Sequence, residues 1–281
     1  MAEGKFFILG YNHYECYKRG FMKKFLSILT LLIFTAAITN AAPLTGGVTE
    51  IGQGNKVVDA QSNTPIEGAL ISIPQLNYKT KTDLNGAFEL NATINGDTIL
   101  SVQKEGYRPF SITIDKSTIN RPIILGIQKT GTFDVVIDDD MIHLGDDTFS
   151  KESANSGEFQ LKSSGPSYTK RFKMTANTLN YNNYLIIGSI IGIDTELAKR
   201  MKQNSITASY SSPPEVFFNG RKVAEIQLNG DNQKIKLPRA LIRPDDVNEI
   251  TIQTGVNQFQ KARVDYDDIE LMNLTIQTEE I

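Results

Sequence analysis

Turn sequences divide this chain into short apolar runs, and that pattern constrains the fold more than any other feature. From residue 46 onward, runs rich in Val, Ile, Thr, Phe and Tyr recur between turns such as "DLNG", "INGD", "FFNG" and "QLNGDNQ". Asn-Gly pairs, at 85–86, 95–96, 219–220 and 229–230, favour the positive φ values of tight hairpins. Only "TELAKRMKQ", residues 195–203, has a helical pattern. The sequence therefore predicts an all-β protein.

The segment near residue 30 has the features of a secretory signal peptide. Met22 and two lysines precede the apolar run "FLSILTLLIFTAAI", which leads into "TNAAP". A basic start, a short apolar run and an Ala-rich exit are typical of a cleaved leader. The run is shorter than the roughly 20 residues that a membrane-spanning helix needs. We expect residues 1–42 to be an upstream extension plus leader, with Met22 as the start and cleavage near residue 42.

Charge and cysteine content narrow the range of partners. The chain has a net charge of −3, and the leader segment is mostly basic, so the mature part is more acidic. No basic block follows residue 42, which argues against nucleic acid and anionic lipid as partners. Cys16 is the single cysteine and precedes the apolar run, so it is removed with the leader. The mature part therefore has no disulfide and must be stabilised by its core and, in one interpretation, by a bound metal. We expect a secreted, extracellular protein without a membrane span, exported by way of the periplasm if its source is Gram-negative.

The first part of the mature chain, residues 43–130, has seven short predicted strands. Its stretches "VVDAQSNTPIEGALISI", "KTKTDLNGAFEL" and "LSVQKEGYRPFSITI" resemble the carboxypeptidase regulatory-like family, a transthyretin-like β-sandwich. The matching positions are Val58, Asp59, residues 65–69, Thr82, Asp83, Gly86, Phe88, Gly106 and Tyr107. The resemblance implies a non-catalytic packing or spacer module.

Each of these motif positions also has a physical reason. Gly68 and Gly86 suit turn conformations that other residues adopt at a cost. Asp83 is able to tie its turn through its side chain, while Phe88 and Tyr107 are expected in the core of the sandwich.

The second part, residues 131–281, has a different strand pattern. "EVFFNGRKVAEIQLNGDNQKIKLPRALIRPDDVNEITIQTG" reads as strand, Asn-Gly turn, strand, turn, strand, Pro-marked loop and strand. It resembles the galactose-binding-like jelly rolls, which occur as carbohydrate-binding modules and as accessory domains of glycoside hydrolases. "HLGDDTFSKESANSGEFQ" and "DYDDIELMNL" resemble the first loop and the last strand of that group. The resemblance implies a jelly-roll β-sandwich, a fold that hosts many functions.

One stretch of the jelly roll is a candidate glycan site. "LNYNNYLI" supplies two rings that are able to stack on a sugar and two amides that are able to hydrogen-bond it. The predicted ligand-binding residues are Tyr181, Asn182, Asn183 and Tyr184. The chain has no Trp, which counts against a strong polysaccharide binder, and the alternation of the stretch also fits rings packed inside the sandwich.

Two acidic pairs are candidate metal ligands. The first and last strands of a jelly roll commonly lie close together, so "HLGDDTF" and "DYDDIEL" are expected to face each other. Carboxylates gathered in a small volume repel one another, and Ca²⁺, which takes 6–8 oxygen ligands, would relieve that repulsion. The predicted structural calcium ligands are Asp146, Asp147, Asp267 and Asp268. The alternative is that these acids are solvated turn residues paired with Lys261 or Arg263.

Catalysis finds little support in the residues. His143 is the single histidine after the leader, and the chain has no G-x-S-x-G nucleophile elbow. Pairs of acids suited to glycoside hydrolysis are plentiful, yet they cluster in turns where solvation explains them. We therefore expect a protein that is not an enzyme.

Together these patterns predict a secreted, non-catalytic binding protein that recognises a glycan or glycoconjugate through its jelly roll. The alternative is a secreted bacterial effector or adhesin-like protein that uses both sandwiches for contacts with a host or surface protein. The two hypotheses differ in whether sugars or proteins are bound.

Overall fold

The computed structural model describes residues 54–281, except 151–152, 154–158 and 207–209. The predicted leader and the extension before it lie outside the described residues. Fifteen β-strands and one short α-helix make up the regular structure of this part, together with four 3₁₀ turns, η1 to η4. None of these helices has the length and hydropathy of a membrane span.

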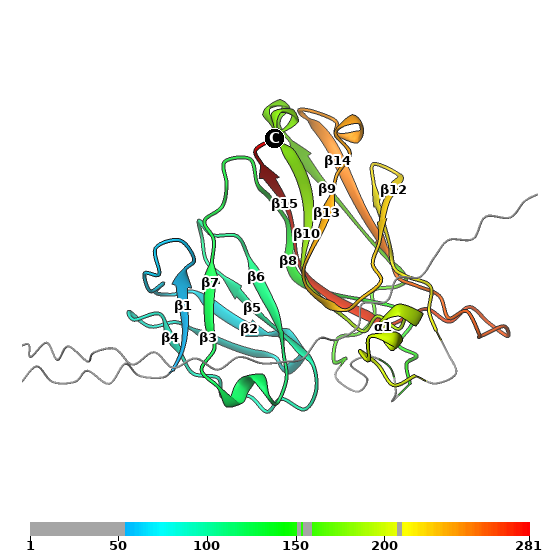
Figure 1. Ribbon diagram of the computed structural model, residues 1–281, viewed down its shortest axis with the longest axis horizontal. Coiled ribbons are helices and arrows are strands. Elements are labelled where there is room, and N and C mark those ends of the chain that lie inside the picture. Colours follow the sequence, from blue (N-terminus) through cyan, green and yellow to red (C-terminus); the bar gives the residue numbers. More distant parts are fainter. Residues whose placement is uncertain (1–53, 151–152, 154–158, 207–209) are drawn as a thin grey trace, which may run out of the picture. The chain divides into compact units, whose positions relative to one another are not determined.

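The first seven strands form a two-sheet sandwich (Figure 1), as the sequence predicts. One sheet has the order β4-β1-β7 and consists of β1 (Asn55–Asp59), β4 (Ala87–Phe88) and β7 (Ile124–Ile127). The other has the order β3-β2-β5-β6, with β2 (Leu70–Ile73), β3 (Tyr78–Lys81), β5 (Thr98–Gln103) and β6 (Phe110–Ile114). The turns η1 (Pro74–Leu76) and η2 (Thr118–Asn120) connect strands of this sandwich.

The motif residues of this sandwich have the roles that the sequence predicts. Gly86 has a φ of +69°, and a Cβ atom there would lie 2.4 Å from the Val57 carbonyl oxygen, so only glycine fits. The Asp83 carboxylate accepts hydrogen bonds from two backbone amides of its own turn. Phe88 is buried in the core, and Tyr107 packs against that core.

The last eight strands form the second sandwich. One sheet has the order β13-β10-β15-β8, with β8 (Val135–Leu144), β10 (Asn182–Ile191), β13 (Gly230–Lys236) and β15 (Ile269–Glu279). The other has the order β12-β11-β14-β9, with β9 (Ser167–Met174), β11 (Glu215–Phe218), β12 (Arg221–Glu225) and β14 (Asp246–Gln253). All pairings in both sheets are antiparallel. Counted from β8, the orders are 6-3-8-1 and 5-4-7-2, the eight-stranded topology of a jelly roll.

Local sequence signals explain several boundaries in the jelly roll. Asn219 and Gly220 have φ values of 49° and 76° and make the two-residue turn between β11 and β12. The predicted helix is present but shorter, as α1 (Glu196–Arg200), with the Thr195 side chain accepting a hydrogen bond from the Ala198 amide at its start. The turns η3 (Ala176–Asn180) and η4 (Arg239–Leu241) precede β10 and β14.

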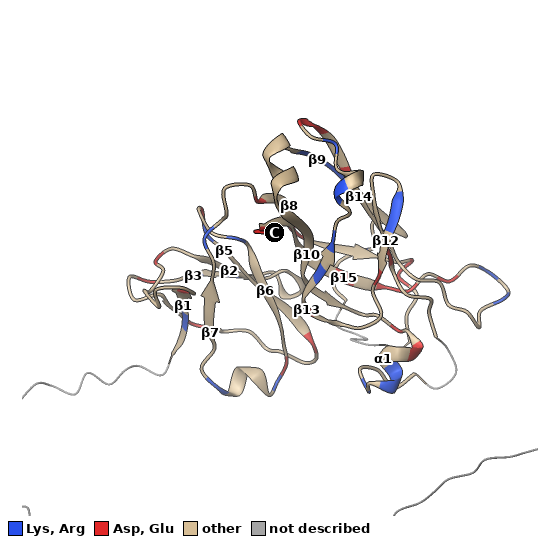
Figure 2. Cartoon of the chain, turned by 45° about the horizontal axis from the view of Figure 1, so that its top comes forward, with Lys and Arg blue, Asp and Glu red and all other residues tan. Residues whose placement is uncertain are grey.

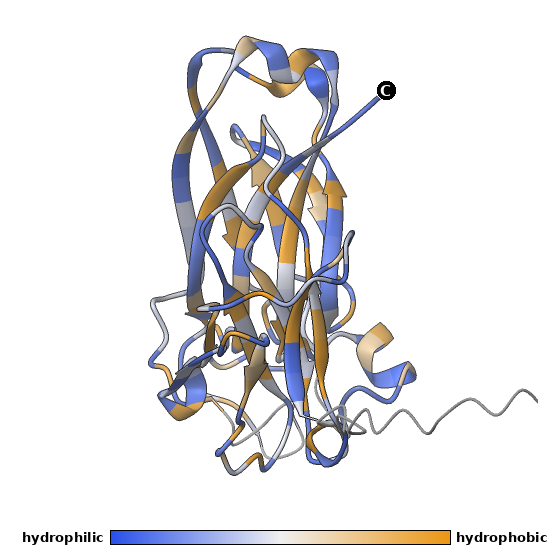
Figure 3. Ribbon diagram, turned by 90° about the vertical axis from the view of Figure 1, so that its left-hand side faces the viewer, coloured by the Kyte–Doolittle hydropathy of each residue, from blue (hydrophilic) through white to orange (hydrophobic). Residues whose placement is uncertain are grey.

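Each sandwich has its own hydrophobic core, since apolar side chains alternate along the strands toward the inside. Hydrophobic and hydrophilic residues both occur along the strands (Figure 3). Residues Thr49–Ile281 nevertheless form one compact unit, in which β6 lies against β10 and β13. Basic and acidic residues are interspersed along the described strands and loops (Figure 2). That the parts 43–130 and 131–281 are independent domains stays a prediction.

Candidate functional site

The acid run before β15 is satisfied by partners that lie far away in the sequence. The Asp268 carboxylate accepts a hydrogen bond from His143 Nε2 at 2.9 Å, and others from the amides of Asp147 and Thr148 at 2.9 and 3.2 Å. The side chains of His143 and Asp268 are both fully buried. Gly145 makes this approach possible, because a Cβ atom there would lie 2.3 Å from Asp268 Oδ1.

Both ring nitrogens of His143 are engaged. Nδ1 lies 2.6 Å from the Leu161 carbonyl oxygen, and Nε2 faces Asp268, so each nitrogen meets an acceptor. Only the protonated ring donates from both nitrogens. Burial by itself would lower the pKa of His143, but these hydrogen bonds and the nearby charges of Glu270 and Asp268 outweigh it and raise the pKa above 6.5. The surroundings of His143 thus favour its protonated form, paired with Asp268.

Glu270 connects the two sandwiches beside this pair. Its Oε2 accepts a hydrogen bond of 2.7 Å from Gln75 Nε2, in η1, and its Oε1 lies 3.8 Å from His143 Nδ1. The Gln75 side-chain oxygen in turn accepts from Thr98 Oγ1 and from the Ile99 amide. Burial raises the pKa of Glu270 to about 7, against the opposing effects of the Gln75 hydrogen bond and the His143 charge.

The four predicted calcium ligands do not gather at one point. Asp147 and Asp268 lie together with His143, and ligand atoms of the three are within 4.8 Å of one another. Asp267 instead accepts a hydrogen bond from the Asp194 amide at 3.0 Å, and burial followed by the Asp194 charge raises the pKa of Asp267 well above its ordinary value. Asp146 is exposed and accepts from the Tyr266 amide at 3.2 Å. Calcium binding at this place stays a prediction.

The predicted ligand-binding stretch is divided between the two faces of its sheet. Asn183 is buried, and its Nδ2 donates to the carbonyls of Thr178 and Tyr181, which fixes the corner between η3 and β10. The Tyr181 ring packs on Phe133, with 5.2 Å between ring centroids. Asn183 and Tyr181 therefore have packing roles. This is the alternative to glycan binding that the alternation of the stretch also allows.

Tyr184 and Asn182 lie on the other face and are half-buried. The Lys234 Nζ lies 4.0 Å from the centroid of the Tyr184 ring, a cation–π contact, and Asn182 Nδ2 donates to the Glu280 carbonyl at 3.2 Å. Tyr184 is paired with Gln277 of β15 across the sheet. Both of these neighbours, Lys234 and Gln277, line a cavity, whereas Tyr184 itself does not.

That cavity is a crevice of about 300 Å³ between the first sandwich and the face of β10 and β15. Lys234 and Gln277 line it next to Tyr184, and Ile186 and Gly188 follow Tyr184 on the same face of β10. The first sandwich contributes Arg108, Phe110 and Ser111, and β15 contributes Asn273 and Glu279. Most of the lining is polar, with Pro109, Phe110 and Ile186 as its apolar side chains. The volume is at the lower end of the roughly 300–1,000 Å³ of small-molecule sites.

Two polar atoms in the crevice lack a partner. Ser111 and Asn273 are only 3% and 1% exposed, and Ser111 Oγ and Asn273 Oδ1 have no hydrogen-bond partner among the described residues. Asn273 Nδ2 donates to Ser101 Oγ at 3.2 Å, which fixes the amide in place. Buried polar atoms without partners are uncommon in folded proteins and call for an explanation.

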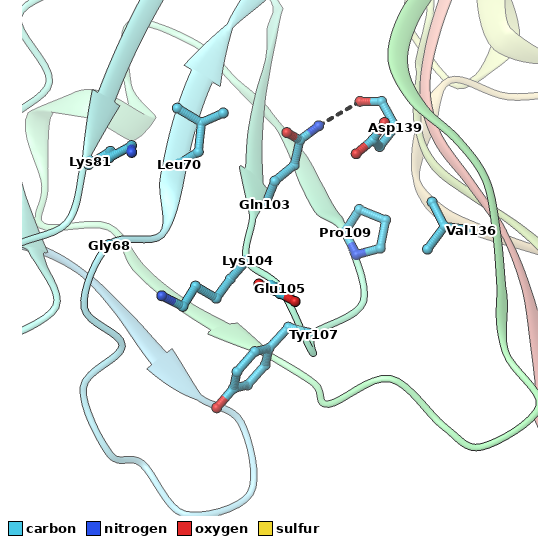
Figure 4. Close-up of a pocket in the computed structure, with 10 residues that line it drawn as sticks. All are labelled: Gly68, Leu70, Lys81, Gln103, Lys104, Glu105, Tyr107, Pro109, Val136 and Asp139. Atoms are coloured by element: carbon cyan, nitrogen blue, oxygen red, sulfur yellow. Dashed lines mark hydrogen bonds between the residues drawn. The ribbon is translucent and has the colours of Figure 1, made fainter.

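A second hollow, of about 460 Å³, lies between β2, β5 and β8 (Figure 4). Lys104 and Glu105 are on its rim, Tyr107 lies below them, and Gln103 Nε2 donates to the Asp139 carbonyl oxygen at 2.8 Å across it. The polar groups here extend along a shallow surface, whereas the crevice gathers buried ones. The crevice is therefore the better candidate.

The crevice residues were not predicted, although two signals exist in the sequence. Gly188 interrupts the apolar strand "LIIGSII", and a glycine inside a strand often marks a close backbone approach. Asn273 is a polar residue inside the apolar run "IELMNLTI". Neither signal names the opposing residue, which belongs to the other sandwich.

Comparison with known proteins identifies the first sandwich. Residues 53–137 match the family model of the CarboxypepD_reg-like domain, which agrees with the predicted resemblance and extends it into the start of β8. No curated protein matches the chain. For the jelly roll, the likeness to galactose-binding-like modules remains a resemblance of sequence pattern.

Proposed function

We propose that this chain is an exported, non-catalytic binding protein whose jelly roll recognises a glycan or glycoconjugate. The observation that carries the proposal is the crevice that Lys234, the cation over the Tyr184 ring, helps to line, with Phe110 and Ile186 among many amide, hydroxyl and charged groups. Sugars present both C–H faces and hydroxyl groups, so they need rings and hydrogen-bonding side chains close together.

The state of His143 supports a non-catalytic role. A general base must reach a proton on a substrate, and this ring is buried with both nitrogens held by fixed acceptors. Its position between Asp268 and Leu161 suits a structural cation.

A glycan array with the 43–281 protein tests the proposal, with Tyr184→Ala as the diagnostic variant. Tyr210→Ala is a matched control, because Tyr210 is also half-buried and also lies under a lysine, Lys199, at 4.7 Å. We expect glycan binding that Tyr184→Ala abolishes and Tyr210→Ala preserves. Equal effects of the two variants, or an array without hits, would count against the proposal.

The second candidate function, protein contact, is favoured by the loop between β14 and β15. Phe259 and Val264 are 56% and 59% exposed there, and exposed apolar side chains close together in one loop often mark interaction sites. This effector or adhesin-like interpretation predicts a protein partner that Phe259→Ser releases. A glycan hit lost with Tyr184→Ala and kept with Phe259→Ser would favour the glycan proposal instead.

Export and calcium are separate proposals. N-terminal sequencing of secreted material tests export, since a mature chain starting near residue 42 or 43 is expected and a secreted chain starting at Met1 or Met22 would contradict it. Calcium, if bound, would be held by Asp147 and Asp268, because Asp267 faces Asp194.

A further inference from the structure

We propose that the glycan site is shared by both sandwiches, and that Ser111 Oγ and Asn273 Oδ1 hydrogen-bond hydroxyl groups of a neutral sugar above Gly188. This inference rests on the proposed glycan binding and specifies where the sugar sits and which class it belongs to. It also gives the CarboxypepD_reg-like domain a part in binding, where its sequence implies a spacer.

The unpartnered atoms point to a ligand that carries hydroxyl groups. Asn273 Oδ1 accepts hydrogen bonds only, since the amide nitrogen is already directed at Ser101 Oγ. Ser111 Oγ both donates and accepts. A buried polar atom without a partner is unfavourable, so a ligand hydroxyl that pairs with either atom restores a missing hydrogen bond and gains binding free energy.

Backbone geometry keeps Asn273 in this position. The pairing of β15 with β8 shifts register between Met272 and Leu274, and Asn273 has a φ of 62°. A left-handed residue in the middle of a strand is a local irregularity that asparagine tolerates better than most residues. The bulge thus holds a polar amide at the crevice in an otherwise apolar strand.

Gly188 supplies the space between the two polar side chains. A Cβ atom at this position would lie 2.5 Å from Ser111 Oγ and 2.8 Å from Asn273 Cβ. The two side chains therefore converge over the backbone of β10. Any larger residue at 188 would fill the place where they meet.

The charges of the crevice are compensated internally, which favours a neutral ligand. Lys234 is paired with Glu279 at 2.6 Å, and both line the crevice. Arg108 is paired with Asp134 at 2.6 Å and also donates to Gln128 at 2.8 Å. An acidic sugar or a phosphate would have to compete with these carboxylates for the cations.

The two walls of the crevice are held together by a clamp at Asp231. Its Oδ1 accepts hydrogen bonds from the Thr113 amide and hydroxyl of β6, both at 2.9 Å, and from Ser189 Oγ of β10 at 2.7 Å. Because β6 also carries Phe110 and Ser111, the clamp fixes the first-sandwich wall relative to Gly188. The site is therefore formed before a ligand arrives, which lowers the entropic cost of binding.

Calorimetric titration of the 43–281 protein tests the inference with methyl glycosides of neutral hexoses and with glucuronic acid as probes. We expect at least one neutral hexoside to bind, and glucuronic acid to bind at least tenfold more weakly. Ser111→Ala and Asn273→Ala are each expected to weaken binding tenfold or more, and Gly188→Ala to abolish it.

Thermal melts of the same variants separate a binding role from a structural one. Ser111→Ala removes an unpaired buried hydroxyl, so its melting temperature should be unchanged or higher, while a structural serine would lose stability. If Tyr184→Ala abolishes binding and the Ser111 and Asn273 variants do not, the shared site is wrong and the proposed function stands. If no sugar binds, both are contradicted, and tighter binding of glucuronic acid would overturn the charge argument.

Discussion

Two buried polar positions of β15, Glu270 and Asn273, lie three residues apart and both contact the first sandwich, yet they differ in one respect. The acid at 270 lies in a chain of partners formed by Gln75, His143 and Asp268. The amide at 273 meets Ser101 on one side and leaves its oxygen unpaired beside an unpaired Ser111 hydroxyl. At the first position one carboxylate oxygen is paired with Gln75, and the other, Oε1, lies 3.8 Å from His143 Nδ1 without a hydrogen bond. At the second position the unpaired atoms are dipoles at a cavity.

The difference suggests how one interface serves two purposes. Burying a charge is tolerable only with partners, so the Glu270 end is expected to determine stability and the mutual position of the sandwiches. At the Asn273 end, the unpaired oxygens of Asn273 and Ser111 make no hydrogen bond and therefore do not stabilise the fold. We interpret the first end as structural and the second as the ligand site.

The largest expected effect is at the paired end. His143→Ala leaves the buried Asp268 carboxylate without its cation, and breaking a buried pair costs about 3–5 kcal/mol of unfolding free energy. Urea unfolding measures this loss. Lys222→Ala is the control, since its pairs with Glu215 and Glu225 are exposed and screened by solvent, so they contribute little to stability. Similar losses in both variants would show that His143 is not a buried structural cation.

A smaller effect is expected across the interface. Gln75→Leu removes the partner of Glu270 and of Thr98, and an unsatisfied buried group costs about 1–3 kcal/mol. The matched change at the other end, Ser111→Ala, should cost nothing. Urea unfolding of the two variants sharpens the comparison, and a Ser111→Ala loss as large as that of Gln75→Leu would remove the distinction between the ends.

The pH dependence of stability extends the comparison to a hydrogen-bonded carboxylate of the first sandwich. Asp59 accepts hydrogen bonds from the amides of Ser62 and Gln61 and from the Tyr107 hydroxyl, and together they lower the pKa of Asp59 to about 2 despite desolvation. Since the folded pKa is below the ordinary 3.8, the stabilisation is full above pH 4 and is lost as pH falls toward 2. Melts between pH 5 and 2 should show Asp59→Asn with a weaker pH dependence than the parent protein. An identical pH dependence would contradict this.

The smallest effect is expected from removing divalent metal. His143 pairs with Asp268, and Asp267 lies apart beside Asp194, so the four acids do not share one place for an ion. We expect EDTA to leave the melting temperature unchanged. A drop that calcium restores, and that Asp147→Ala eliminates, would establish a calcium site at Asp147 and Asp268.

The sequence predicts the fold well because its signals are local. Asp83 and Gly86 define a turn by their own chemistry, and Asn219-Gly220 defines a hairpin, so strands and sandwiches follow from neighbouring residues. The jelly-roll order is different, because its sheets pair strands that lie far apart in the sequence, and it was expected from the resemblance to galactose-binding-like modules. The helix predicted over 195–203 is longer than the observed one, because only the turn capped by Thr195 is helical.

The site is less predictable because its parts come from distant segments. The acids before β15 were expected to meet the end of β8, and strand pairing brings them there, but the partner of Asp268 is His143. The raised pKa of His143 depends on acceptors from distant segments, Asp268 and Leu161, which no sequence pattern brings together. The pairing of Ser111 with Asn273 across Gly188 depends on how the two sandwiches pack. Alternation in "LNYNNYLI" allowed both binding and packing, and the structure assigns Asn183 to packing and leaves Tyr184 beside the crevice.

A crystal structure of the 43–281 protein with a bound neutral hexoside is the most direct test of the central claim. The account predicts a sugar in the crevice, with hydroxyl groups within hydrogen-bonding distance of Asn273 Oδ1 and Ser111 Oγ and with Gly188 beneath the ring. A sugar bound elsewhere, with only water molecules between Ser111 and Asn273, would contradict it.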